Sequence, residues 1–189
     1  MPRPPILKPI DWEAVHQSGL PFAQWLDQGE NPDHQARMRA LVSELVLSPE
    51  TRALLAGLSR TVNVVAIAED WCGDVVRHAP VLEVLAQASK RLSVRYVSRE
   101  QHPDVFVRFL TNGGEAIPKF VFLSDKWVEC GNWGPMPAQH RRLIARGKAA
   151  GDVGAARRRV SALYDADPNC EEVVAELVEL IVTASCTRP

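Results

Sequence analysis

The sequence has few cysteines, no long apolar run and almost no net charge. Its 189 residues include 4 cysteines and carry a formal charge of -1. Four cysteines are too few for a disulfide scaffold, and they lack the paired close spacing of a zinc site, so no metal site and no cofactor is expected. Neither a stretch of eighteen apolar residues nor a signal peptide is present, which predicts a cytoplasmic protein with reduced thiols and no membrane contact. The near-neutral charge gives no overall attraction to nucleic acid.

Three zones follow one another along the chain. Residues 1–60 predict a helical N-terminal extension packed on the core, residues 61–150 an α/β domain, and residues 151–189 a C-terminal helical extension. Within the middle zone the pattern predicts strands at 62–68, 92–98, 119–124 and 127–132 and helices at 73–90 and 102–110. The order strand, helix, strand, helix, strand, strand, followed by a helix, indicates an α/β fold with a mixed sheet.

The most informative segment surrounds Cys72. This cysteine follows a predicted buried strand and begins a helix, where free backbone N–H groups and the helix dipole stabilise a thiolate. Arg77 and His78 would add positive charge if they fold back towards the sulfur, whereas Asp74 opposes them. His78 lies nearly two helical turns from Cys72, so we do not expect it to act as a general base.

Four features in the right order resemble the thioredoxin superfamily. Trp71-Cys72-Gly73 resembles the start of the thioredoxin Trp-Cys-Gly-Pro-Cys site, Pro80 falls at the helix-kinking proline, Ile117-Pro118 resembles the cis-proline loop, and Trp133-Gly134 resembles the loop that completes the substrate groove. The resemblance covers roughly residues 60–145 and implies a thioredoxin-like fold with extra helices at both ends. The Trp-Cys-Gly-Asp form is similar to a bacterial branch of thioredoxin-like proteins.

The resemblance also implies the site residues. Cys72 would be the nucleophile, and the substrate groove would consist of Trp71, Gly73, Asp74, Ile117, Pro118, Trp133 and Gly134. A cis bond before Pro118 would expose the backbone of residue 117 beside Cys72, where an extended substrate can pair by strand addition.

Two departures from the thioredoxin pattern limit the chemistry. The resolving cysteine is replaced by Val75 and the buried acid by Ala66, so disulfide reduction by the two-cysteine route is not expected. Asp74 stands where thioredoxin has proline, and its charge disfavours the thiolate of Cys72.

These features leave two functions open. The leading hypothesis is a monothiol protein that performs thiol–disulfide exchange through Cys72, with an external thiol resolving the intermediate. Its partners would be a protein or a low-molecular-weight thiol or disulfide; oxidation of Cys72 to a sulfenic acid that serves as a signal is a variant of this chemistry. The alternative is a redox-inactive peptide-binding or chaperone-like module that uses the same groove.

The remaining cysteines are expected to be structural. Cys170 and Cys186 lie sixteen residues apart in one predicted helix, about 24 Å along its axis, and cannot bond to each other. Cys130 would supply a resolving thiol only if it approached Cys72, which its expected position on an edge strand disfavours.

Charge is unevenly distributed near the C-terminus. Seven basic residues between 141 and 159 precede six acids between 165 and 179. Mutual neutralisation between packed helices, or across a dimer, is the simplest interpretation, and nucleic-acid binding is not expected. The apolar face of the last helix either covers the domain or forms a homodimer.

Overall fold

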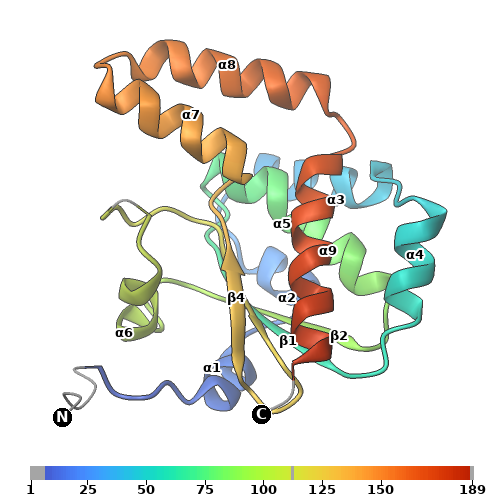
Figure 1. The fold of residues 1–189 in the computed structure, drawn as a ribbon. Coiled ribbons are helices and arrows are strands. Elements are labelled where there is room, and N and C mark those ends of the chain that lie inside the picture. Colours follow the sequence, from blue (N-terminus) through green and yellow to red (C-terminus); the bar gives the residue numbers. More distant parts are fainter. Residues whose placement is uncertain (1–6, 112, 188–189) are drawn as a thin grey trace.

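A four-stranded mixed sheet forms the centre of the protein (Figure 1). The structure, a computed structural model, describes residues 7–111 and 113–187. The strands are β1 (Val62–Ile67), β2 (Leu92–Val97), β3 (Lys119–Leu123) and β4 (Glu129–Trp133), in the order β2-β1-β3-β4 across the sheet. β1 pairs in parallel with β2, whereas β3 runs antiparallel to both β1 and β4. The predicted α/β fold with a mixed sheet is confirmed.

The two central strands are buried along their whole length. Every residue of β1 and of β3 is buried, while the edge strand β4 buries only Trp133. A strand covered on both faces consists mostly of apolar residues instead of alternating with polar ones, which explains the β-branched run of β1 and the Phe-Val-Phe-Leu run of β3.

Helices cover both faces of the sheet. α5 (Gly73–Gln87) and α9 (Glu171–Cys186) lie on one face; α1 (Trp12–Ser18) and α6 (Pro103–Phe106), which continues as a 3₁₀ turn over Val107–Phe109, lie on the other (Figure 1). Because α5 begins where β1 ends, its first turn and Cys72 lie at the carboxyl edge of the two parallel strands. This edge carries the site described below.

The N-terminal helices complete the core beside α5. They are α2 (Phe22–Asp27), α3 (Pro32–Glu44) and α4 (Pro49–Ala56). α3 packs along α5 and buries Met38 and Leu41. Asp11 caps α1 by accepting from the Ala14 N–H at 3.0 Å, and Ser48 caps α4 by accepting from the Thr51 N–H at 3.1 Å. Capping satisfies donors that the helix itself leaves unpaired.

A helical hairpin lies between β4 and α9 in the sequence. Its helices α7 (Ala138–Ala149) and α8 (Val153–Ala166) pack against each other and project from the body at the top of Figure 1. A Cβ atom built on Gly147 would lie 2.4 Å from the Cβ of Ala156, so the two helices can approach this closely only because residue 147 is glycine.

Neither a membrane-spanning helix nor a cluster of metal ligands is found in the part of the chain that the structure describes. None of its helices is both long and apolar enough to cross a membrane. Within the same residues, no three His, Cys, Asp or Glu side chains gather as metal ligands would.

Candidate functional site

Cys72 occupies the N-cap position of α5 and is half-buried. Its Sγ lies 3.5 Å from the carbonyl oxygen of Ile117, to which the thiol donates a hydrogen bond. The Ile117–Pro118 peptide bond is cis. The cysteine and the loop before β3 are 45 residues apart in the sequence and meet at the carboxyl edge of β1.

Burial raises the pKa of the Cys72 thiol. The backbone N–H groups of Val75 and Asp74 act in the opposite direction, as expected at a helix N-terminus, but they do not outweigh the loss of water. The carboxylate of Asp74 raises the pKa of Cys72 further, and the guanidinium of Arg99 lowers it. Thiolate stabilisation by the helix is thus present, but desolvation exceeds it, because the sulfur lies partly under the Ile117 loop.

The positions that would complete a two-cysteine site are apolar. Val75 and Ala66 are both fully buried in the core beneath Cys72. Neither a thiol nor a carboxylate is therefore available where thioredoxins use one.

Gly134 fixes the geometry of the proline loop. A Cβ atom at this position would lie 2.0 Å from the carbonyl oxygen of Pro118, and the residue has φ of +120°, which an L side chain rarely adopts. The Gly134–Pro135 bond is also cis. Lys119 and Arg141 both donate to the carbonyl oxygen of Gly134, at 2.8 and 3.3 Å, and so hold the two loops together.

Lys119 is a buried cation that the sequence analysis did not identify as part of the site. Burial lowers its pKa to about 8, and the charge of Arg141 acts in the same direction. A lysine directly after a proline loop and at the start of a buried strand was the available signal.

Arg99 is the cation near Cys72, in place of the predicted Arg77 and His78. It follows β2, whose carboxyl end lies beside that of β1, and its guanidinium lies 5.3 Å from the ring centroid of Trp71. It also pairs with Glu69 at 3.7 Å and with Glu115 at 3.3 Å. A basic residue directly after the second parallel strand was the sequence signal that this role required.

Arg77 and His78 point away from the sulfur. The guanidinium of Arg77 donates to the backbone oxygens of Tyr164 and Asp167, at 2.7 and 3.2 Å, and thereby ties α8 to α5. His78 is fully buried, and burial lowers its pKa to about 3, with the charge of Arg77 acting in the same direction. A neutral histidine in the core does not stabilise a thiolate.

The two tryptophans of the predicted groove differ in environment. Trp71 is 56% exposed beside Cys72 and presents its aromatic surface to solvent. Trp133 is only 3% exposed, stacks on Phe120 and donates to Glu176 at 2.6 Å. Trp133 therefore supports the site from within the core, whereas Trp71 and the exposed Gly73 form its surface.

The loop before Cys72 is anchored to the N-terminal helices. A carboxylate oxygen of Asp70 accepts from the N–H of Asn31 at 2.8 Å, and the Asp70 backbone oxygen lies 2.7 Å from Nδ1 of His34. Asp70 is buried, and the sequence analysis gave it no role. The N-terminus of α3, with its cap Asn31 and with His34, thus positions the Trp71-Cys72 loop.

Asp74 lies between two cavities at the start of α5. One cavity, of about 330 Å³, is also lined by Ala116 of the proline loop and by Arg141 and Lys148 of α7. The other, of about 490 Å³, lies towards α8 and α9 and includes Tyr164. Burial raises the pKa of Asp74 to about 6, although Arg77 opposes the shift. Asp74 is therefore mostly ionised at neutral pH.

The other cysteines do not complete a redox pair in this structure, in which all four cysteines are free thiols. Cys130 lies on the edge strand β4, and its thiol donates to the backbone oxygen of Val128 at 3.2 Å. Cys170 is buried at the N-cap of α9, and Cys186 is exposed at the end of the same helix. That these three cysteines are structural remains a prediction.

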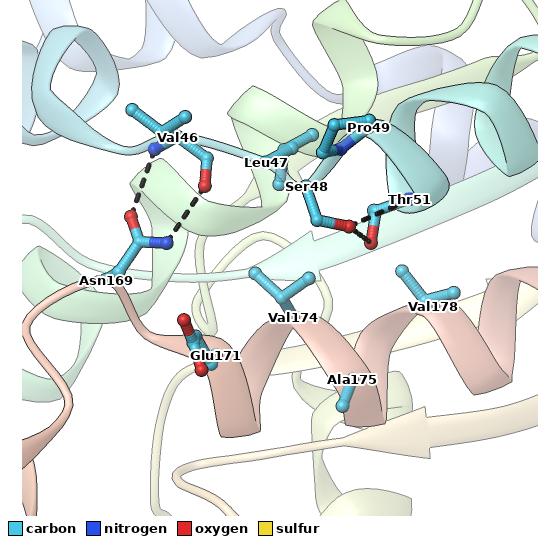
Figure 2. Close-up of a pocket in the computed structure, with 10 residues that line it drawn as sticks. All are labelled: Val46, Leu47, Ser48, Pro49, Thr51, Asn169, Glu171, Val174, Ala175 and Val178. Carbon is cyan, nitrogen blue, oxygen red and sulfur yellow. Dashed lines mark hydrogen bonds between the residues drawn. The ribbon is translucent and has the colours of Figure 1, made fainter.

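Another cavity lies away from Cys72. It measures about 550 Å³ and is formed between α9 and the link from α3 to α4 (Figure 2). At its edge the side-chain amide of Asn169 makes two hydrogen bonds to the backbone of Val46, of 3.0 and 2.9 Å, which join these segments. None of its lining residues belongs to the Cys72 loop or to the proline loop.

The mixed sheet, the cysteine at the first turn of α5 and the adjoining proline loop define a thioredoxin-like protein. A family model described as "Thioredoxin" matches residues 19–150, and the chain belongs to that family. A search of curated proteins finds no significant match.

Solved structures agree on the fold. A crystal structure of PA1234, a protein of unknown function from Pseudomonas aeruginosa, is similar with a TM-score of 0.71 and 16% identity over 92% of this chain and 98% of that one. An HIV 4E10 epitope-scaffold is similar with a TM-score of 0.69 and 14% identity over the same shares of the two chains. At these identities the likeness concerns the fold alone.

Proposed function

We propose that the protein performs thiol–disulfide exchange with Cys72 as the single attacking thiol and an external thiol as the resolving group. The observation that carries this proposal is the position of the Cys72 Sγ, at the N-terminus of α5 and 3.5 Å from the Ile117 carbonyl oxygen, in a chain of the thioredoxin family. The finer assignment, to a Trp-Cys-Gly-Asp branch with one active cysteine, belongs to the same proposal.

The reaction has two balanced steps. The Cys72 thiolate attacks the outer sulfur of a mixed disulfide between a protein and a small thiol, which forms a Cys72–small-thiol disulfide and expels the protein sulfur as a thiolate that takes up a proton. A second small thiol, as its thiolate, then attacks that outer sulfur and expels the Cys72 thiolate. The small-thiol pair is oxidised to its disulfide, the substrate protein is reduced, and Cys72 returns to its initial state.

The proline loop suits an extended polypeptide substrate. The Ile117 carbonyl, which accepts from the thiol in the free protein, is at the position where a substrate N–H would pair by strand addition. Trp71, Gly73 and Asp74 would contact the residues on either side of the substrate cysteine, with Pro118 and Gly134 shaping the loop behind them. Such a cycle requires an abundant reduced small thiol, and we therefore propose the cytoplasm as its location.

A second candidate function is peptide binding without redox turnover. It is favoured by the raised pKa of Cys72 and by the apolar residues Val75 and Ala66, which leave these two positions without a thiol and without an acid. The same groove would then hold an extended peptide by backbone pairing and contacts to Trp71.

One experiment separates the two functions. The protein is incubated with glutathione disulfide and analysed by mass spectrometry with peptide mapping, beside Cys72→Ser and, as a control at an exposed thiol, Cys186→Ser. Exchange predicts an adduct on Cys72 that reduced glutathione removes and that persists in Cys186→Ser. An unmodified Cys72, together with equal recovery of partner proteins by the native chain and by Cys72→Ser, would instead support the binding module.

A further inference from the structure

The α7–α8 hairpin carries basic side chains that form no ion pair with any carboxylate of the described residues. Its seven bases are Arg141, Arg142, Arg146, Lys148, Arg157, Arg158 and Arg159. Across residues 7–111 and 113–187, none of them forms an ion pair with a carboxylate. All except the half-buried Arg141 are exposed.

Among the described residues, none of the acids at 165–179 forms an ion pair with these bases, and two of the acids bind other groups. Glu176 accepts from the indole of Trp133 and from the N–H of Ala138, at 2.6 and 2.9 Å. Glu172 pairs with His140 at 3.3 Å. These acids hold the base of the hairpin to the body, while the six bases other than Arg141 are exposed to solvent.

The hairpin also forms a wall of the candidate site. Arg141, Ile144 and Lys148 of α7 line the 330 Å³ cavity together with Asp74 and the proline-loop residue Ala116. The guanidinium of Arg141 is fixed there, because it donates to the backbone oxygens of Met136 and Gly134 at 2.7 and 3.3 Å. A polypeptide that pairs with Ile117 would therefore run past the positive surface of α7.

We propose that the α7–α8 hairpin recruits acidic protein segments and presents a cysteine within them to Cys72. The inference rests on the proposed exchange reaction and specifies its substrate class. Opposite charges on the hairpin and on the substrate increase the rate at which the two associate, and they disfavour partners of the wrong charge. Both effects weaken as salt is added. Because the carboxylates of Asp74 and Glu115 also line this cavity, the acids of the substrate would lie several residues from its cysteine and face Arg141, Lys148 and the other arginines of the hairpin.

A protein partner fits these observations better than a nucleic acid. Residues 138–166 contain a single aromatic residue, Tyr164, and its ring is covered by the guanidinium of Arg77 at 4.1 Å and by His140 at 4.7 Å, so it offers no stacking platform for bases. The backbone group presented by Ile117 pairs with a polypeptide.

The test compares two peptides that differ only in charge. Each contains one cysteine, blocked as a mixed disulfide with 2-mercaptoethanol, and has either glutamates or lysines several residues from it. We expect Cys72 to react with the acidic peptide at least about tenfold faster at low salt, with the difference closing at high salt. Equal rates for the two peptides at low salt would overturn the inference.

Matched variants assign the effect to the hairpin. Arg146→Gln with Lys148→Gln removes two exposed charges from α7. Lys90→Gln with Arg91→Gln removes the same two charge types from exposed positions in the turn after α5. The double variant in the hairpin should lose most of the preference for the acidic peptide, and the double variant in the turn after α5 should keep it. Loss of the preference in both double variants would overturn the inference.

Two further measurements separate this inference from the exchange reaction itself. 2,2′-Dithiodipyridine, which is uncharged, reports whether Cys72 reacts at all, and failure with this reagent would refute the exchange reaction. Binding of the reduced peptides to Cys72→Ser then still decides the role of the hairpin, with tighter binding of the acidic peptide expected. Binding of DNA of mixed sequence more tightly than the acidic peptide would overturn the inference in favour of a nucleic-acid surface.

Discussion

The thiol of Cys72 donates a hydrogen bond to the carbonyl oxygen of Ile117 across 3.5 Å, and this contact joins the active helix to the proline loop. In this arrangement the proton is held by the thiol, because burial raises the pKa of Cys72. An extended substrate that pairs with Ile117 would take over this carbonyl and leave the sulfur free to attack. In the proposed reaction the groove and the nucleophile would therefore be coupled through one backbone oxygen.

Asp74→Asn should lower the pKa of Cys72, since it removes a negative charge near the sulfur and keeps the N–H of residue 74 that favours the thiolate. The pH dependence of iodoacetamide alkylation reports this pKa in a chain whose other three cysteines are replaced. Glu83→Gln, an equivalent neutralisation in the last part of α5, is the control and should leave the profile unchanged. An unchanged profile in Asp74→Asn would show that Asp74 does not act on the thiol.

Arg99→Gln should shift the same profile in the opposite direction. Loss of the guanidinium removes the positive charge that lowers the pKa of Cys72, so alkylation at neutral pH becomes slower. Because Arg99 also contacts Trp71 and pairs with Glu69, a packing effect must be distinguished from a charge effect. Arg99→Lys keeps the charge and should restore much of the rate; equal slowing in both variants would contradict an electrostatic role.

Gly134→Ala should destabilise the protein by about 3 kcal/mol or more, because a Cβ atom there would meet the Pro118 oxygen at 2.0 Å in a backbone conformation unsuited to alanine. Urea unfolding measures the change. Gly73→Ala is the matched control, since a Cβ at residue 73 meets nothing within 4 Å. Equal midpoints for Gly134→Ala and the native chain would refute the close approach of the two loops.

His78 should make the fold sensitive to acid. Its pKa is lowered to about 3 in the folded state, so below the ordinary histidine pKa the unfolded chain binds a proton that the folded chain does not. The contribution of the neutral His78 to the free energy of unfolding is fully present above about pH 6.5. It falls by about 2 kcal/mol on acidification to pH 5. The loss in His78→Phe over this interval should be smaller by that amount, measured by urea unfolding at the two pH values. Parallel losses in both proteins would contradict a buried neutral imidazole.

Sequence patterns predicted those parts of the fold and site that are encoded locally. The strand before Cys72, the helix after it and the order of the proline loop and β4 follow from short runs of residues. The caps Asp11 and Ser48 likewise depend on neighbours three residues away.

What the sequence did not predict depends on contacts between distant segments. Asp70 and its partner Asn31 are 39 residues apart, and Arg99 and Glu69 are neighbours only because β1 and β2 are adjacent and parallel. The direction of the pKa shift at Cys72 could not be predicted from the sequence either. The sequence indicates the helix N-terminus, which lowers the pKa, but it does not indicate the burial of the sulfur beside the Ile117 loop, which raises it.

Catalytic turnover tests the central claim most directly. A peptide that carries a glutathione mixed disulfide is supplied in large excess over the protein together with reduced glutathione, and release of the peptide thiol is followed with time. The account predicts many turnovers by the native chain and by Cys130→Ser, with Cys72→Ser at the uncatalysed rate. Release at the uncatalysed rate by all three proteins, or equal catalysis with and without Cys72, would contradict it.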